Sequence, residues 1–118
     1  MAVLRGDIVT TGIEQGPGMP LKRRPVVVVQ NDRNNRRLHS AIVAQITSNT
    51  KLAQKEPTQV LVDITTPEGQ QTGLVHTSAV KCENVYVKLQ RDMRKIGQMP
   101  ASLMQQVDAA LKSSLDLK

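Results

Sequence analysis

Apolar positions along most of the chain fall into short runs that have the composition of β-strands. Residues 5–13 are rich in β-branched side chains, and four consecutive valines follow Pro25. A continuous apolar run that is too short for a helix is typical of a strand buried on both faces. Applied along the chain, these criteria predict strands over residues 5–13, 25–30, 40–47, 58–64, 72–77 and 80–89.

Glycine, proline and polar residues separate these runs. Segment 14–24 contains two glycines and two prolines and ends in three consecutive basic residues, so it is expected to be a flexible loop with a basic end. Segment 31–36 is polar and predicts a turn or a single helical turn. Pro67-Glu68-Gly69 predicts another turn before the last strands.

The period of the apolar positions changes after Pro100, a residue that suits the first turn of a helix. From Ala101 onward one face is apolar at helical spacing, with Leu103, Met104, Val107, Ala110, Leu111, Ser114 and Leu115. Strands followed by one amphipathic helix predict a mainly β (α+β) fold, a small curled β-barrel or sandwich covered by that helix. A chain of 118 residues is expected to form a single domain over residues 1–118.

Composition narrows the cellular setting. No apolar run approaches the roughly 18 residues that a membrane span needs, and the N-terminal residues lack the apolar stretch of a signal peptide. A single cysteine, Cys82, excludes an internal disulfide, and the cysteine–histidine spacing of zinc sites is absent. These observations predict a soluble cytoplasmic protein without a bound metal.

The net charge of +6 is unevenly distributed along the chain. Residues 21–40 contain six basic residues and one acidic residue, which favours a polyanionic partner such as nucleic acid. A solvated basic face is the alternative, and charge alone does not decide between them. Tyr86 is the only aromatic residue, so a platform of aromatic rings for stacking bases is excluded, and a compact site that works on phosphate is favoured.

Several blocks of sequence occur in an order that resembles the MazF/PemK family. They are Arg5-Gly6-Asp7-Ile8-Val9, Arg24-Pro25-Val26-Val27-Val28-Val29-Gln30-Asn31-Asp32 with Asn35-Arg36, and Ala41-Ile42-Val43-Ala44-Gln45-Ile46-Thr47-Ser48. The ending Val107-Asp108-Ala109-Ala110-Leu111-Lys112-Ser113-Ser114-Leu115 is similar to the final helix of that family. The resemblance covers nearly the whole chain, and the ordered series is more specific than any single block.

This resemblance implies a small SH3-like β-barrel with a C-terminal helix that acts as a homodimer. It also implies a sequence-specific endoribonuclease without metal or cofactor, which cuts single-stranded RNA such as mRNA through attack of the 2′-hydroxyl. Such a protein inhibits translation as the toxin of a toxin–antitoxin pair, and its partner would be an acidic, partly disordered antitoxin. Gyrase-inhibiting toxins resemble the same fold. A non-enzymatic toxin or nucleic-acid-binding module therefore remains the alternative, as does a member that binds RNA without cutting it.

Metal-free RNA cleavage requires a proton acceptor for the 2′-hydroxyl, stabilisation of charge on the phosphoryl oxygens and protonation of the leaving 5′-oxygen. By its position before Pro25, Arg24 is similar to the catalytic arginine of the family. A guanidinium binds two phosphoryl oxygens at once and stays charged, so Arg24 is expected to stabilise charge or to donate a proton. Thr47 occupies the second catalytic position, where its hydroxyl can hydrogen-bond a phosphoryl oxygen or orient the 2′-hydroxyl.

The proton acceptor is less well defined by the resemblance. Lys81-Cys82-Glu83 lies where some members carry Arg-Cys-Asp, which makes Glu83 the candidate general base, with a solvated loop pair as the alternative. His39 and His76 have no spacing that brings them together and lie at no catalytic position typical of the family, so a paired-histidine mechanism is not favoured.

Basic and polar residues near these positions are expected to bind RNA. They are Lys22, Arg23, Asn31, Asp32, Arg33, Asn35, Arg36, Arg37, Ser48 and Lys81. Strand alternation directs Arg23 to the face opposite that of Arg24. The first strand carries Thr10-Thr11 where relatives have an aromatic residue, so the cleavage sequence does not transfer from the family.

Overall fold

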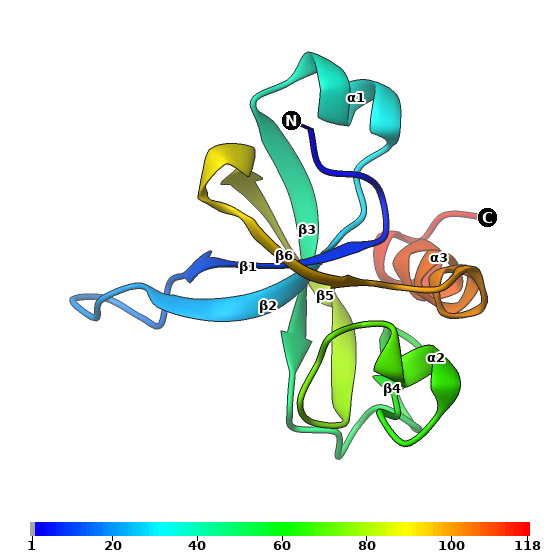
Figure 1. Ribbon diagram of the computed structural model, residues 1–118. Coiled ribbons are helices and arrows are strands. Elements are labelled where there is room, and N and C mark those ends of the chain that lie inside the picture. The colour runs from blue at the N-terminus through cyan, green and yellow to red at the C-terminus, as the bar shows by residue number, and fades with distance from the viewer. Residues whose placement is uncertain (1) are drawn as a thin grey trace.

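Six strands form one antiparallel sheet in the order β4-β5-β3-β2-β1-β6 in the computed structural model, which describes residues 2–118. The strands are β1 (Asp7–Ile13), β2 (Lys22–Val28), β3 (Ser40–Thr47), β4 (Gln59–Val62), β5 (Ser78–Leu89) and β6 (Arg94–Gln98). The helices are α1 (Asp32–Arg37), α2 (Pro67–Gln70), the 3₁₀ turn η1 (Gln90–Asp92) and α3 (Ala101–Leu115). In Figure 1 the paired strands β1 and β2 extend to the left of the molecule, and α3 lies at the right.

Both faces of the sheet carry apolar clusters near its centre. On one face, Val27 packs with buried residues of α3, such as Val107, and with the thiol of Cys82. On the other face, Val26 and Val28 pack with buried residues of β1 and β3. The valine run is therefore buried on both faces, as predicted. Burial in the first cluster raises the pKa of the Cys82 thiol to about 12, because a thiolate there would be desolvated.

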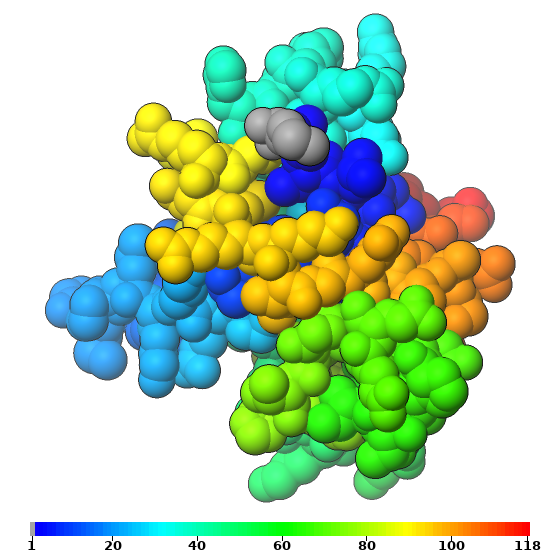
Figure 2. Space-filling model, viewed as in Figure 1, coloured from blue at the N-terminus to red at the C-terminus, as the bar shows by residue number. Residues whose placement is uncertain are grey.

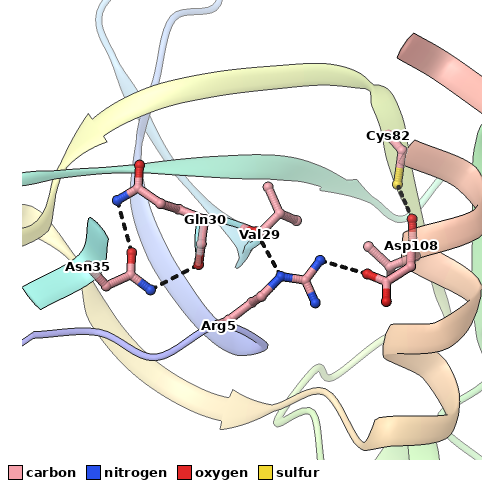
Figure 3. A network of polar contacts seen from close by, with 7 residues as sticks. Arg5, Val29, Gln30, Asn35, Cys82 and Asp108 are labelled. Carbon is pink, nitrogen blue, oxygen red and sulfur yellow. Dashed lines mark hydrogen bonds and ion pairs between the residues drawn. The ribbon is translucent and has the colours of Figure 1, made fainter. Parts of the chain in front are cut away.

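Arg5 connects the N-terminal segment to the C-terminal helix. Its Nε donates a hydrogen bond to the carbonyl of Val29 at 2.9 Å, and its Nη2 pairs with Oδ1 of Asp108 at 2.6 Å (Figure 3). The fork of the guanidinium thus spans from the end of β2 to α3, and it adds a polar restraint to the apolar packing of that helix.

The short segment between α2 and β5, here called the bridging segment, packs against β6, the edge strand of the sheet. The amide of Gln98 donates to the carbonyl of Gln71 at 3.0 Å. The approach is so close that a Cβ on Gly73 would lie 2.0 Å from the Ile96 carbonyl oxygen, and one on Gly97 would lie 2.2 Å from the carbonyl of Thr72. Gly73 also has a positive φ of 72°, which L-residues with side chains rarely adopt.

The predicted fold class is confirmed: a curled, mainly β sheet is covered by one C-terminal helix. The strand over residues 40–47 and the helix from Ala101 agree with prediction, whereas Pro100 is the N-cap and not part of the first turn. The strand predicted over residues 72–77 is wrong, because this segment forms turns. β6 was not predicted, since its sequence is polar and mostly exposed. No helix within residues 2–118 is long and apolar enough to cross a membrane.

Candidate active site

A groove opens where β2 and β3 separate. β2 pairs with β1 from Lys22 to Val27 but pairs with β3 only from Val26 to Val28. Upstream of Val26, β2 follows β1 outward as a projecting hairpin, whereas the end of β3 stays paired with β5 (Figures 1 and 2). Pro25, which has no N–H to donate, occupies the point where pairing with β3 stops.

The strand register places several polar side chains in this groove. Side chains alternate between the two faces of a strand, so every second residue of β2 and of β3 shares a face. Val26 is opposite Gln45, so the row of β2 residues that contains Val26 and the row of β3 residues that contains Gln45 lie on the same face of the sheet. Towards the centre of the sheet these two rows contain buried residues such as Val43. Beyond the core they continue with Arg24 on β2 and with Gln45 and Thr47 on β3.

The groove has a volume of about 500 Å³. Residues from five parts of the chain line it, among them Arg24, Gln45, Thr47, Ser48, His76 and Tyr86. The structure thus brings the two residues with the strongest family resemblance, Arg24 and Thr47, into one cavity. Arg24 is exposed, and its guanidinium makes no hydrogen bond or ion pair with any residue between 2 and 118, so it can bind an anion.

The Thr47 hydroxyl is oriented by the turn that follows β3. Its Oγ1 accepts a hydrogen bond from the amide of Asn49 at 3.1 Å. One lone pair is therefore occupied, and the hydroxyl proton has no acceptor among residues 2–118. A hydroxyl held in this way can donate to an oxygen of a ligand in the groove.

Gln45 is oriented by an irregularity in the pairing of β3 with β5. Ala44 is opposite Val85, but Gln45 is opposite Lys81, so residues 82–84 form a bulge. Within the bulge, Nδ2 of Asn84 donates to Gln45 Oε1 at 2.8 Å, and beyond it the Tyr86 hydroxyl donates to the same oxygen at 3.3 Å. The Gln45 amide nitrogen keeps no partner among residues 2–118, which leaves its two N–H groups for a ligand.

An ion pair neutralises the acidic residue at the rim of the groove. Glu14, from the loop after β1, pairs with Lys88 at 2.7 Å, and the Lys88 ammonium lies 5.9 Å from the centroid of the Tyr86 ring. The hydrogen bond from Lys88 lowers the pKa of the Glu14 carboxyl. Glu14 is therefore a weak proton acceptor, and its charge is balanced within the protein.

Comparisons with known proteins agree with the fold. Residues 4–115 match the family described as PemK-like, MazF-like toxin of type II toxin-antitoxin system. The chain belongs to this family. Endoribonuclease MazF6 of Mycobacterium tuberculosis is 38% identical over 99% of this chain and 100% of its own length. Endoribonuclease EndoA of Bacillus subtilis is 37% identical over 99% of this chain and 97% of its own.

A solved structure shows the same architecture. An endoribonuclease from a mycobacterial species, determined in complex with its cognate antitoxin, has a TM-score of 0.79 at 20% identity. The match covers 99% of this chain and 98% of that chain. At this level of identity the likeness demonstrates the fold. The family predicted from the ordered blocks is thus confirmed.

Other residues predicted from the family lie away from the groove. Glu83 is exposed on the bulge of β5, where its carboxylate accepts a hydrogen bond from Gln59 Nε2 at 2.9 Å. It does not line the groove. Lys81 lines a separate small hollow of about 80 Å³, which shares Thr47 with the groove. Of the Lys81–Glu83 pair, only the lysine therefore shares a hollow with Thr47.

The basic residues of segment 21–40 divide into two groups. Lys22 is exposed on the projecting hairpin, and Arg23 lies on the opposite face from Arg24, where it donates to the Asp92 carbonyl at 2.7 Å. Arg33, Arg36 and Arg37 are exposed on α1, which precedes the start of β3, whereas Thr47 ends it. The eight-residue strand separates them by about 23 Å.

The remaining polar residues around α1 have structural partners. Asn35 is only 1% exposed, donates to the Gln30 carbonyl at 3.0 Å and accepts from Gln30 Nε2 at 3.0 Å (Figure 3). Asn31 caps α1, and Asp32 accepts from the Arg5 amide at 2.6 Å. The Asn35 side chain is therefore bonded within the protein, and its role in RNA binding stays a prediction.

The sequence interpretation missed His76, Gln45 and Tyr86 as groove residues. Gln45 could have been found from its spacing of two residues from Thr47 on one strand. His76 was not favoured because its spacing from His39 brings no pair together and because it lies at no catalytic position typical of the family. In the structure it lies just before β5 begins, and the start of β5 is paired with the end of β3. Among residues 2–118, no three histidine, cysteine, aspartate or glutamate side chains cluster in a way that would hold a metal ion.

Proposed function

We propose that this family member is a metal-independent endoribonuclease that cuts single-stranded RNA, mRNA included, as the toxin of a type II toxin–antitoxin pair. The convergence of Arg24 and Thr47 on one solvent-open groove of about 500 Å³ carries the proposal. A free guanidinium and a free hydroxyl proton provide donors for the charged phosphoryl oxygens of a scissile phosphate.

In the proposed reaction, the 2′-oxygen attacks the adjacent phosphorus as its proton leaves, and the bond between phosphorus and the 5′-oxygen breaks. The products are a 2′,3′-cyclic phosphate and a 5′-hydroxyl. Arg24 stabilises the charge that develops on the phosphoryl oxygens, and Thr47 donates a hydrogen bond to one of them. Ser48 and Lys81, which lie next to Thr47, bind the flanking phosphates.

Specific cleavage requires contacts to bases on both sides of the phosphate. Residues 14–24 are exposed throughout, so the hairpin can close over an RNA strand in the groove.

We expect the protein to act in the cytoplasm, where mRNA is translated. The cognate antitoxin is expected to be an acidic chain that covers the same groove, because it would complement the +6 charge of the toxin.

A homodimer is the assembly that we propose. Ile42, Val85, Val87 and Leu89 form an exposed apolar row where β3 pairs with β5, and Val87 is 66% exposed. The row adjoins a hollow of about 690 Å³ lined by Leu89 and residues of α1. An exposed apolar patch next to a hollow is typical of an interface. Replacing Val87 with lysine should therefore shift the mass measured by light scattering from dimer to monomer, and an unchanged mass would contradict this interface.

The function is tested by incubating purified protein with long single-stranded RNA of mixed sequence in excess EDTA. We expect cleavage by the wild type, and loss of cleavage in Arg24→Ala. Arg23→Ala is a matched control, because it removes the neighbouring charge from the opposite face. Absence of cleavage by the wild type on all RNAs would overturn the nuclease and favour a toxin that inhibits by binding. Cleavage by Arg24→Ala at the wild-type rate would overturn the site.

A further inference from the structure

We propose that His76 is the general base of the cleavage reaction, a role that rests on the proposed nuclease function of the groove. The imidazole would accept the proton of the attacking 2′-hydroxyl. Histidine is suited to this step because it changes protonation between about pH 5 and pH 8.

The carboxylates near the site do not fill this role. Glu83 lies outside the groove and is hydrogen-bonded to Gln59 at 2.9 Å. Glu14 lines the rim, but its ion pair with Lys88 at 2.7 Å stabilises the unprotonated form and makes it a weak base. Of the groove residues that the structure describes, His76 remains as a proton acceptor suited to neutral pH.

The position of His76 suits a base that works opposite Arg24. In the sheet, β3 lies between β2 and β5, so Arg24 at the start of β2 and His76 just before β5 flank the end of β3 from opposite sides. Thr47 ends β3 between them. A phosphate held by Arg24 and Thr47 would therefore have its neighbouring ribose within the part of the groove that His76 lines.

Hydrogen bonds to its neighbours hold the segment of His76 in place although it has no regular secondary structure. The Ser78 hydroxyl donates to the His76 carbonyl at 2.8 Å, and the Thr77 hydroxyl accepts from the Ile64 amide at 3.2 Å. His76 itself is exposed, and its imidazole makes no hydrogen bond with residues 2–118, so its ring nitrogens are available to a substrate.

Four groups set the electrostatic environment of the His76 imidazole. Arg24 on β2 and Tyr86 on β5 line the same groove, and Glu14 in the loop after β1 is neutralised by Lys88. Asp63 precedes Ile64, whose amide donates to the Thr77 hydroxyl, and the Asp63 carboxylate accepts a hydrogen bond from the Thr65 hydroxyl at 2.7 Å. Arg24 is therefore the cation without an ion pair, among the described residues, that lines the groove together with His76.

The proposed step is balanced within the enzyme and its substrate. His76 takes the 2′-hydroxyl proton as the bond between the 2′-oxygen and phosphorus forms. The electron pair of the breaking bond leaves on the 5′-oxygen, which takes a proton from water, or from Arg24, which then regains a proton from solvent. The protonated His76 then returns its proton to solvent before the next turnover.

The test compares His76→Ala and His76→Gln with His39→Ala as the matched control. His39 is the only other histidine of the chain, is also exposed and lines the distant hollow beside α1. Single-turnover rates on mixed-sequence RNA are measured from pH 5 to 9 in EDTA. Binding to the same RNA with 2′-deoxy substitution, which cannot be cut, is measured in parallel.

We expect the wild-type rate to rise with pH across the range of imidazole titration, and His39→Ala to behave in the same way. Both His76 variants should bind the deoxy-substituted RNA normally but cut about 10²–10⁴-fold more slowly, with the pH rise lost. Added imidazole should raise the rate of His76→Ala and not that of Arg24→Ala. A His76→Ala rate near that of the wild type, with the same pH profile, would overturn this role and leave the nuclease intact. No cleavage by the wild type would overturn the nuclease itself.

Discussion

Replacing Thr47 by valine provides a direct test of how the groove stabilises the transition state. Valine has nearly the same shape but no hydroxyl, so the substitution removes the donor that faces the groove. It also removes the acceptor of the Asn49 amide, whose hydrogen bond to Oγ1 is 3.1 Å long. Asn49 is exposed, and water can replace this second interaction.

The two losses have different sizes. Removing one oriented donor to a developing oxyanion slows a reaction by about 10²–10³, or about 2.7–4 kcal/mol. The groove is open to solvent, so the lower end of this range, about 10²-fold, is expected for Thr47→Val. The lost hydrogen bond to Asn49 should cost at most about 1 kcal/mol of folding stability, because the residue is only partly buried.

The assay measures single-turnover cleavage in EDTA together with thermal unfolding. Thr47→Ser keeps the hydroxyl and should retain most of the activity. Thr50→Val is a control for the same substitution on the adjoining turn, outside the groove. A Thr47→Val rate equal to that of the wild type would refute the role of the hydroxyl. An equal loss in Thr47→Ser would show that the hydroxyl alone does not account for the role of Thr47.

Three further predictions concern the fold that holds the groove. Gly97→Ala should lower the melting temperature by about 5 °C or more, because the Cβ of the new alanine would lie 2.2 Å from the Thr72 carbonyl. An unchanged melting curve would mean that the bridging segment does not pack against β6. With a pKa of about 12, only about a 10⁻⁴ fraction of Cys82 should be thiolate at pH 8, so the thiol should react with iodoacetamide only in denaturant. Rapid labelling of the native protein would contradict the burial of Cys82 under α3. Asn35→Ala should lower the free energy of unfolding in urea by about 1–3 kcal/mol, while the affinity for RNA, measured on the folded protein, stays unchanged. A weaker affinity would support a contact between Asn35 and RNA.

The elements that sequence predicts best are those whose burial decides their pattern. β3 and α3 were predicted nearly to the residue, because their apolar rows pack against the core. β6 has no such row, since it is a polar edge strand that pairs only with β1. Segment 72–77 has β-branched residues, but Thr72 is buried by turn contacts, with its hydroxyl donating to the Gly69 carbonyl at 2.6 Å.

The candidate site was predictable where residues lie on regular strands. Side chains alternate regularly along β2 and β3, and Val26 is paired with Gln45. Arg24 and Thr47, each two residues from this pair along its strand, therefore lie on the same face. Glu83 could not be placed in the same way, because the bulge over residues 82–84 shifts the register of β5 by an amount that no local pattern encodes. The same bulge brings Asn84 to Gln45, a contact that depends on tertiary structure alone.

The point where β2 leaves β3 also bears on how such a protein can change over evolution. From residue 14 to residue 24 every side chain is exposed, and the buried valines begin only after Pro25. Insertions, deletions and substitutions in that arm, Arg24 excepted, therefore alter the wall of the groove while leaving the folding of the domain nearly untouched. Related sequences can diverge in the RNA they select by varying one projecting hairpin, and the same arm is the natural place to engineer a different selectivity.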